Sequence, residues 1–80
     1  MTWKDFVCLK WQFASHLAMA DYHYTTSTAE ANGHTFAFCS RVPTEEYKAE
    51  HRHARCCEHY KVDGVLYNTR KALEIALAKI

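Results

Sequence analysis

The sequence has only two glycines and one proline among its 80 residues, so residues that form tight turns are scarce. Small domains held together by disulfide bonds normally have many turn residues and regularly spaced cysteines, and this chain has neither. Two of its four cysteines, Cys56 and Cys57, are adjacent and poorly placed to bridge each other. We therefore expect free thiols and a reducing, cytoplasmic environment.

Long apolar segments are also missing from the chain. Lys10, Gln12 and His16 interrupt the apolar residues of the first twenty positions, so we expect no secretory signal. No apolar run reaches membrane-spanning length, and no membrane association is expected. The formal net charge is only +1, so bulk charge gives no argument for nucleic-acid binding.

Aromatic residues, in contrast, are abundant. They make up 14% of the chain and can supply a compact core in a protein this short. Charged residues make up an ordinary 24%, which favours a folded chain over a disordered one. The length fits one domain that spans residues 1–80.

The first segment combines a helix start signal with an ambiguous apolar pattern. Thr2 and Asp5 have the spacing of a capping box, with Asp in place of the usual Glu. Apolar residues on one broad helical face follow, and alanines favour helix in the second half. This predicts a helix over about residues 3–20. The alternation of apolar and other residues over positions 7–13 is typical of a strand and gives the alternative.

Asn32-Gly33 is the clearest turn signal in the chain. It separates two runs rich in aromatic and β-branched residues, at positions 22–28 and 34–42. Asn-Gly between two such runs indicates a β-hairpin, because both turn positions need positive φ.

A two-residue turn also fixes which residues face each other. It places Ala29 opposite Phe36 and Ser27 opposite Phe38, with both phenylalanines on the side that packs on helices. In an alternative interpretation, Ser27 to Glu30 form a capping box and start a helix, which gives an all-α bundle. That helix would have to include the Asn-Gly pair, which is costly in a helix interior.

The stretch from Pro43 to Gly64 predicts the central helix of the fold. Two glutamates follow near its start, where they suit the positive end of the helix dipole. No helix breaker occurs in the next fifteen residues, and the final glycine is a typical stop. We therefore predict a helix over about residues 44–61.

Two stripes with helical spacing divide this predicted helix. One stripe can pack against the rest of the protein and consists of Ala49, His53, Cys56 and Tyr60. The opposite stripe is basic and consists of Lys48, Arg52, Arg55 and His59, with Arg41 approaching from the hairpin.

A last helix is expected after Asn68 and Thr69, either of which can cap it. Its buried stripe is predicted to be Leu73, Ala76, Leu77 and Ile80. The predicted fold is therefore α+β, in the order helix, strand, strand, helix, helix, with the Asn-Gly hairpin packed on the helices.

Four residues of the central stretch are candidates for a metal site: His53, Cys56, Cys57 and His59. On one helix, His53 with Cys57 and Cys56 with His59 form two pairs that point in different directions. A closed zinc site needs four convergent ligands, so we expect no metal and no cofactor, and a Cys/His metal-binding domain is an alternative.

The same pairs raise the question of thiol catalysis, because a neighbouring histidine can generate a thiolate. No glycine-rich oxyanion loop accompanies Cys56 or Cys57, and 80 residues leave little room for a substrate cleft. We expect no enzymatic activity.

The basic stripe gives the functional hypothesis. Lys48, Arg52, Arg55 and His59, together with Arg41, are predicted to contact an acidic protein or a protein–nucleic-acid complex. Free nucleic acid is the alternative partner, with Tyr22 and Tyr24 stacking on bases. Small binding domains often act as phage-type accessory proteins that block a host nuclease or defence complex, so an inhibitor or adaptor is expected.

Overall fold

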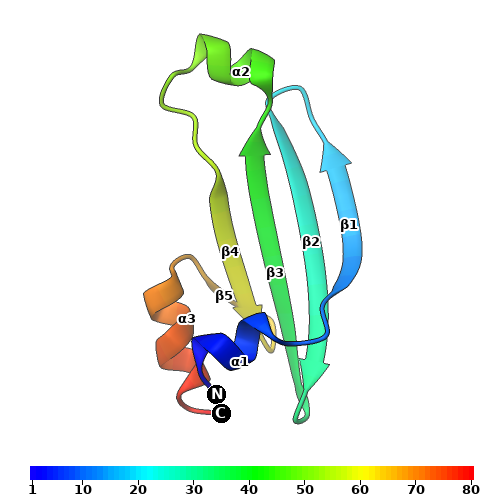
Figure 1. The fold of residues 1–80 in the computed structure, drawn as a ribbon, viewed down its shortest axis with the longest axis vertical. Coiled ribbons are helices and arrows are strands. Elements are labelled where there is room, and N and C mark those ends of the chain that lie inside the picture. Colours follow the sequence, from blue (N-terminus) through cyan, green and yellow to red (C-terminus); the bar gives the residue numbers. More distant parts are fainter.

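The computed structural model describes residues 1–80 and contains three short helices and one five-stranded sheet (Figure 1). In chain order the elements are α1 (Trp3–Val7), β1 (Gln12–Ala18), β2 (Tyr22–Ala31), β3 (His34–Pro43), α2 (Glu45–Glu50), β4 (Cys57–Val62), β5 (Val65–Tyr67) and α3 (Arg70–Leu77). Neighbouring strands are antiparallel, and their order in the sheet is the order in the chain. The sheet is therefore a simple meander.

The hairpin formed by β2 and β3 is the longest pairing in the sheet. Both residues of the Asn32-Gly33 turn have positive φ, 53° and 79°, as a two-residue turn requires. Ala29 pairs with Phe36, and Ser27 pairs with Phe38. The predicted turn and register are confirmed.

The helices gather at the two ends of the sheet. α1 and α3 lie together at one end, next to both chain termini, and α2 lies at the opposite end (Figure 1). The amino group of Met1 donates hydrogen bonds to the carbonyl oxygens of Leu77 (3.1 Å) and Ile80 (3.3 Å), which ties the termini together. The molecule measures 43 × 23 × 19 Å, so the helices cover only part of the long sheet.

The hydrophobic core lies between the sheet and the α1–α3 pair. Six buried side chains form it: Phe6, Phe36, Tyr60, Val62, Leu73 and Leu77. The Phe6 ring meets the rings of Phe36 and Tyr60 edge-on, with centroid distances of 6.1 and 5.9 Å. Such contacts add about 0.5–1.5 kcal/mol each beyond the area they bury. One helix from each end of the chain is thereby fixed to β3 and β4.

The last helix agrees with the sequence prediction. The hydroxyl of Thr69 accepts a hydrogen bond from the first turn of α3 and caps it. Leu73 and Leu77 are completely buried, while Ala76 and Ile80 are half-buried at the edge of the core.

The predicted α+β fold, in the order helix, strand, strand, helix, helix with a hairpin packed on helices, is wrong, because the structure is mostly one five-stranded antiparallel sheet. The all-α alternative is wrong for the same reason. The first error lies in residues 3–20. The capping box of Thr2 and Asp5 is present, but α1 ends at Val7 and a strand follows after a short connection. Helix propensities differ by only about 0.7 kcal/mol per residue or less. Six residues of the strand pair with the open edge of β2, whose backbone groups would otherwise have no partner in the sheet, and this outweighs that preference.

The second error is the central helix over residues 44–61. The helix that begins there, α2, ends at Glu50, and β4 follows after a loop. Asp63-Gly64 is not a helix stop but a second two-residue hairpin turn, with φ values of 50° and 85°. Strand geometry puts both Tyr60 and Val62 on the core side of the sheet, and this burial favours the strand.

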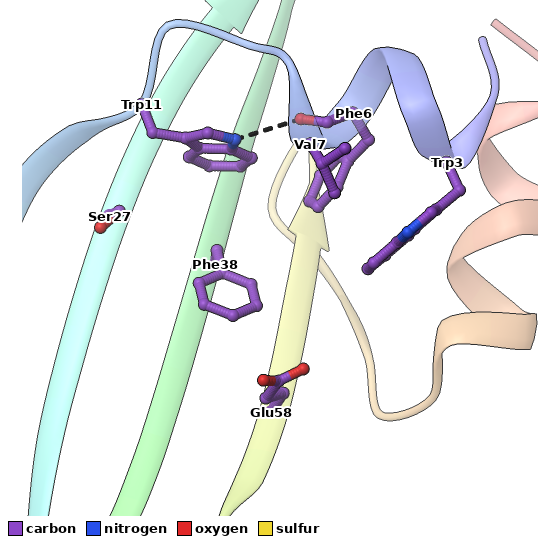
Figure 2. Close-up of a pocket in the computed structure, with 7 residues that line it drawn as sticks. All are labelled: Trp3, Phe6, Val7, Trp11, Ser27, Phe38 and Glu58. Atoms are coloured by element: carbon purple, nitrogen blue, oxygen red, sulfur yellow. Dashed lines mark hydrogen bonds between the residues drawn. The ribbon is translucent and has the colours of Figure 1, made fainter.

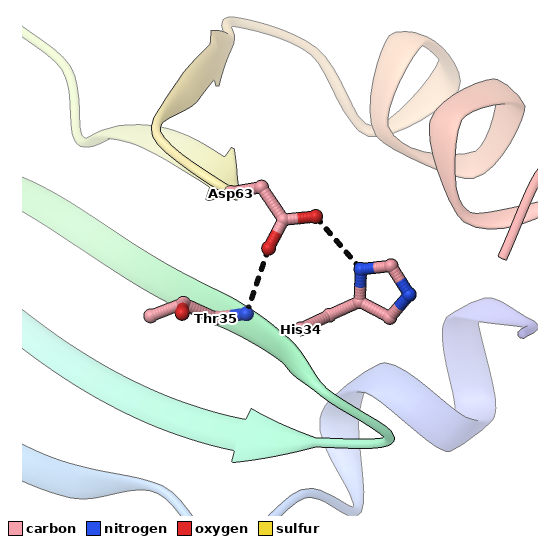
Figure 3. A network of polar contacts seen from close by, with 3 residues as sticks. All are labelled: His34, Thr35 and Asp63. Atoms are coloured by element: carbon pink, nitrogen blue, oxygen red, sulfur yellow. Dashed lines mark hydrogen bonds and ion pairs between the residues drawn. The ribbon is translucent and has the colours of Figure 1, made fainter.

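Asp63 also connects the second turn to the first hairpin (Figure 3). Its carboxylate lies 2.7 Å from Nδ1 of His34 and accepts a 2.9 Å hydrogen bond from the backbone N–H of Thr35. The contact with His34, followed by the one with Thr35, lowers the pKa of Asp63. Asp63 therefore does more than form part of a turn, because its side chain joins the β4–β5 turn to the start of β3.

Two phenylalanines, one buried and one exposed, should differ greatly in their contribution to the free energy of unfolding. Phe36→Ala should lower the free energy of unfolding by about 3–5 kcal/mol, because Phe36 is completely buried. Phe13→Ala on β1, where the side chain is 69% exposed, should change it by about 0.5 kcal/mol or less. Urea denaturation followed by circular dichroism measures both values. Similar losses for the two variants would contradict the assigned core.

The raised pKa of Tyr60 predicts that the folded state loses stability at alkaline pH. Burial, and then the hydrogen bond that its hydroxyl donates to Glu58 (3.0 Å), raise the pKa of Tyr60 to about 12. An unfolded chain releases this proton near pH ~10, so the folded state binds more protons between about pH 10 and 12. Stability should therefore fall with rising pH across this window. The urea midpoint of Tyr60→Phe should fall less steeply there than that of the unmodified chain; parallel curves would refute the assignment.

Candidate functional site

Strand alternation gives the sheet two faces of different character. On β3, Phe36 and Phe38 lie on the face that carries α1 and α3, whereas Cys39 and Arg41 lie on the opposite face. We call this opposite face the open face, because neither α1 nor α3 covers it. Its central residues on β2, β3 and β4 are Tyr22, Tyr24, Thr26, Cys39, Arg41, Cys57, His59 and Lys61.

Arg41 is the cation that the open face holds in place. Its Nη2 donates a 3.3 Å hydrogen bond to Sγ of Cys57, which lies directly opposite on β4. Its Cζ lies 4.6 Å from the ring centroid of Tyr22, a cation–π contact. Its Nε is buried and has no hydrogen-bond partner. The bond to Cys57 raises the already high pKa of Arg41, so this positive charge is permanent.

Tyr22, which contacts this charge, belongs to a cluster of aromatic rings. The ring of Tyr22 lies 6.2 Å from that of Tyr24 and 5.1 Å from that of Tyr47 on α2. Tyr47 in turn stacks on His51, with centroids 4.1 Å apart and an interplanar angle of 18°. Burial of its hydroxyl raises the pKa of Tyr22. The rings are thus fixed against one another before any partner binds.

Three further cations surround a hollow next to this cluster, and we call the segment that carries them, residues 48–55, the basic loop. Lys48, Arg52 and Arg55 line a hollow of about 420 Å³ together with Pro43 at the end of β3. All three cations are exposed. Lys48 belongs to α2, and both arginines lie in the connection from α2 to β4. The predicted helical stripe is wrong, but these three residues still come together.

The four cations have no carboxylate partner within the chain. The structure contains two ion pairs, His34 with Asp63 and Arg70 with Glu74, and neither involves Arg41 or the basic loop. Their charge is therefore available to a partner.

His59, the fifth predicted site residue, lies apart from the basic loop. It occupies the middle of β4, opposite Cys39 on the open face. Its Nδ1 lies 3.1 Å from Oδ1 of Asn68, which follows β5. His59 thus belongs to the same face as Arg41 but is directed toward the β5 side of the sheet.

The metal candidates do not converge. His53 lies in the loop, and Cys56 and Cys57 follow each other into a strand, where successive side chains point to opposite faces. His59 contacts Asn68 instead of a cysteine. No group of three or more His, Cys, Asp or Glu side chains in the structure has an arrangement that holds a metal ion.

The cysteine–histidine pairs expected from helical spacing are also wrong, because the segment is not helical. Cys57 contacts Arg41, and the hydroxyl of Thr26 lies 3.8 Å from Sγ of Cys39. All four cysteines are free. The open face therefore offers charge, aromatic rings and thiols.

Comparison with known protein families, with curated proteins and with solved structures finds no match for this chain. None of its helices is both long enough and apolar enough to pass through a lipid bilayer.

The sequence interpretation missed part of the aromatic cluster. Tyr47 was assigned to a long helix, so its contact with Tyr22 was not expected. The alternation of β2 nevertheless contains the signal: once Ser27 faces the helices, Tyr22 and Tyr24 must face the other way. The sequence pattern does not predict the contact of Cys57 with Arg41, because this contact depends on the pairing of β3 with β4.

The site geometry predicts different roles for two arginines. Arg41→Ala should lower the free energy of unfolding by about 1 kcal/mol, because it removes a cation–π contact and a packed aliphatic stem. Arg55→Ala removes the same charge from the exposed loop and should change stability by about 0.5 kcal/mol or less. Urea denaturation of both variants tests this difference. Equal stability of the two variants would contradict the assigned role of Arg41.

Proposed function

We propose that this chain is a non-catalytic binding protein, an inhibitor or adaptor. Its open face and basic loop dock on an acidic surface of a protein or of a protein–nucleic-acid complex. The observation that carries the proposal is a set of cations that form no ion pair within the chain: Arg41 on the open face, and Lys48, Arg52 and Arg55 around one hollow.

The residue types support a protein interface. Arginine and tyrosine are enriched among the residues that contribute most to binding energy. Here Tyr22 packs on Arg41, and Tyr24 and Tyr47 pack on Tyr22, in the unbound chain. Side chains that are ordered beforehand lose little conformational entropy on binding, which favours affinity. The cluster is suited to form the centre of an interface.

The basic loop suits the rim of the same interface. Lys48, Arg52 and Arg55 are exposed and have no carboxylate partner within the chain, so carboxylates of a partner can pair with them directly. Exposed charges of this kind increase association rates and select against partners of the wrong sign. We therefore place Arg41 at the centre of the proposed interface and the exposed cations Lys48, Arg52 and Arg55 at its rim.

Free single-stranded nucleic acid is the second candidate. One observation favours it: Tyr22, Tyr24 and Arg41 lie on an uncovered sheet face, where aromatic rings and guanidinium groups can stack on bases. The basic loop would then contact phosphates.

Charge reversal in the basic loop tests the proposal. Arg52→Glu with Arg55→Glu should weaken binding of the captured partner by about 30-fold or more, because two ion pairs become two repulsive contacts. The melting temperature should change by less than about 3 °C, because both side chains are exposed. The partner is captured from an extract of the source cell, and its affinity is measured by surface plasmon resonance.

The matched control reverses the same number of charges elsewhere. Lys4 on α1 and Lys71 on α3 are exposed and lie at the end of the molecule opposite α2 (Figure 1), so Lys4→Glu with Lys71→Glu should retain the partner. Equal loss of binding in both double variants would refute a specific role of the basic loop. Binding of a fluorescent 12-nucleotide single strand that falls steeply between 50 and 200 mM salt would instead support the nucleic-acid candidate.

A further inference from the structure

A second hollow, of about 360 Å³, lies on the helix-bearing face of the sheet, opposite the open face (Figure 2). Trp3 from α1 and Trp11 from the connection to β1 form two of its sides, and Phe38 from β3 and Glu58 from β4 close it below. Its volume lies in the range of small-molecule sites. The lining is mainly aromatic, with one carboxylate.

The aromatic walls are held in position by contacts with Phe6, which also lines the hollow, and with Arg70. The indole N–H of Trp11 donates a 3.1 Å hydrogen bond to the carbonyl oxygen of Phe6, and the two rings meet edge-on at 5.0 Å. Trp3 stacks on Phe6 at 5.6 Å, and the guanidinium of Arg70 lies 4.4 Å from the centroid of the Trp3 ring. A ligand therefore meets walls that need little reordering.

Glu58 is a carboxylate without a cation. Its Oε2 accepts a hydrogen bond from the neutral hydroxyl of Tyr60, which orients it, and it takes part in neither ion pair of the chain. The nearby cation Arg70 is already paired with Glu74, at 3.8 Å. The hollow thus combines a carboxylate that forms no ion pair and four aromatic side chains, Trp3, Phe6, Trp11 and Phe38.

We infer that this hollow binds a small organic ammonium ion, of the alkylated type in which methyl groups surround the charge. Aromatic ring faces attract such cations, and the alkyl groups make the cost of leaving water smaller than for a bare ammonium. Glu58 supplies the charge complementarity. This site is independent of the proposed docking function, because it lies on the other face of the sheet.

The two tryptophans make the site directly observable. They are the only ones in the chain, and both line the hollow, so tryptophan fluorescence reports its occupation. Choline and its neutral isostere 3,3-dimethylbutan-1-ol have the same shape and differ in charge. Choline should bind about tenfold more tightly or better. Equal affinities, or no saturable change with either compound, would overturn the inference.

Glu58→Gln keeps the acceptor for Tyr60 but removes the charge. This variant should bind choline about fivefold more weakly and leave the affinity for the neutral isostere unchanged. The matched control is Glu30→Gln, an exposed carboxylate on the open face of β2, which should leave both affinities unchanged. Unchanged choline binding in Glu58→Gln, or an equal loss in both variants, would refute the role of Glu58.

An alkylated ammonium group occurs both in free metabolites and in the methylated side chain of lysine. A short peptide with one trimethyllysine, compared with the same peptide with unmodified lysine, distinguishes these sources. Binding of the methylated peptide about tenfold more tightly than choline identifies a protein side chain as the ligand, and equal or weaker binding identifies a free ion. Tighter binding of the unmodified peptide than of the methylated one would overturn the preference for an alkylated cation.

Discussion

The packing of Phe6 against Phe36 and Tyr60 is the contact on which the arrangement of this protein depends. It joins the first helix to two central strands, and the same cluster includes the last helix. Because the core lies at one end of a 43 Å molecule, much of the sheet has no covering layer. A chain of this length buries only about 60% of its unfolded surface, so extensive exposed area follows from its size. The proposed docking surface lies on the part of the sheet that this core does not cover.

Strand alternation in β4 separates two surfaces of opposite chemistry. Cys57 and His59 point to the open face, where Arg41 lies, and Glu58 and Tyr60 point to the helix side. Four consecutive residues therefore contribute to a cationic surface on one side and to an aromatic hollow with a carboxylate on the other. The sheet separates the cations of one face from the carboxylate of the other, so they do not neutralise each other. A helix over the same residues would have distributed them around one cylinder.

Two dipeptides show how much of the fold the sequence predicts. Asn32-Gly33 was interpreted as a hairpin turn, and its register was predicted correctly. Asp63-Gly64 has the same chemistry and nearly the same φ values, but it was interpreted as a helix stop. The preceding residues lack glycine and proline, so local propensity permitted a helix. The burial of Tyr60 and Val62 beside β3 decides the outcome, and this is tertiary information that a helical pattern does not contain.

The candidate site was predicted in part for a similar reason. Lys48, Arg52 and Arg55 are close in sequence, so a short helix followed by a loop brings them together almost as a long helix would. Arg41 joins them through strand pairing, which places it opposite Cys57, sixteen residues away in the chain. Proximity along the chain therefore predicts which charges are neighbours. The contacts that hold Arg41 depend on the sheet topology. The sequence alone therefore does not distinguish this fixed cation from the exposed ones.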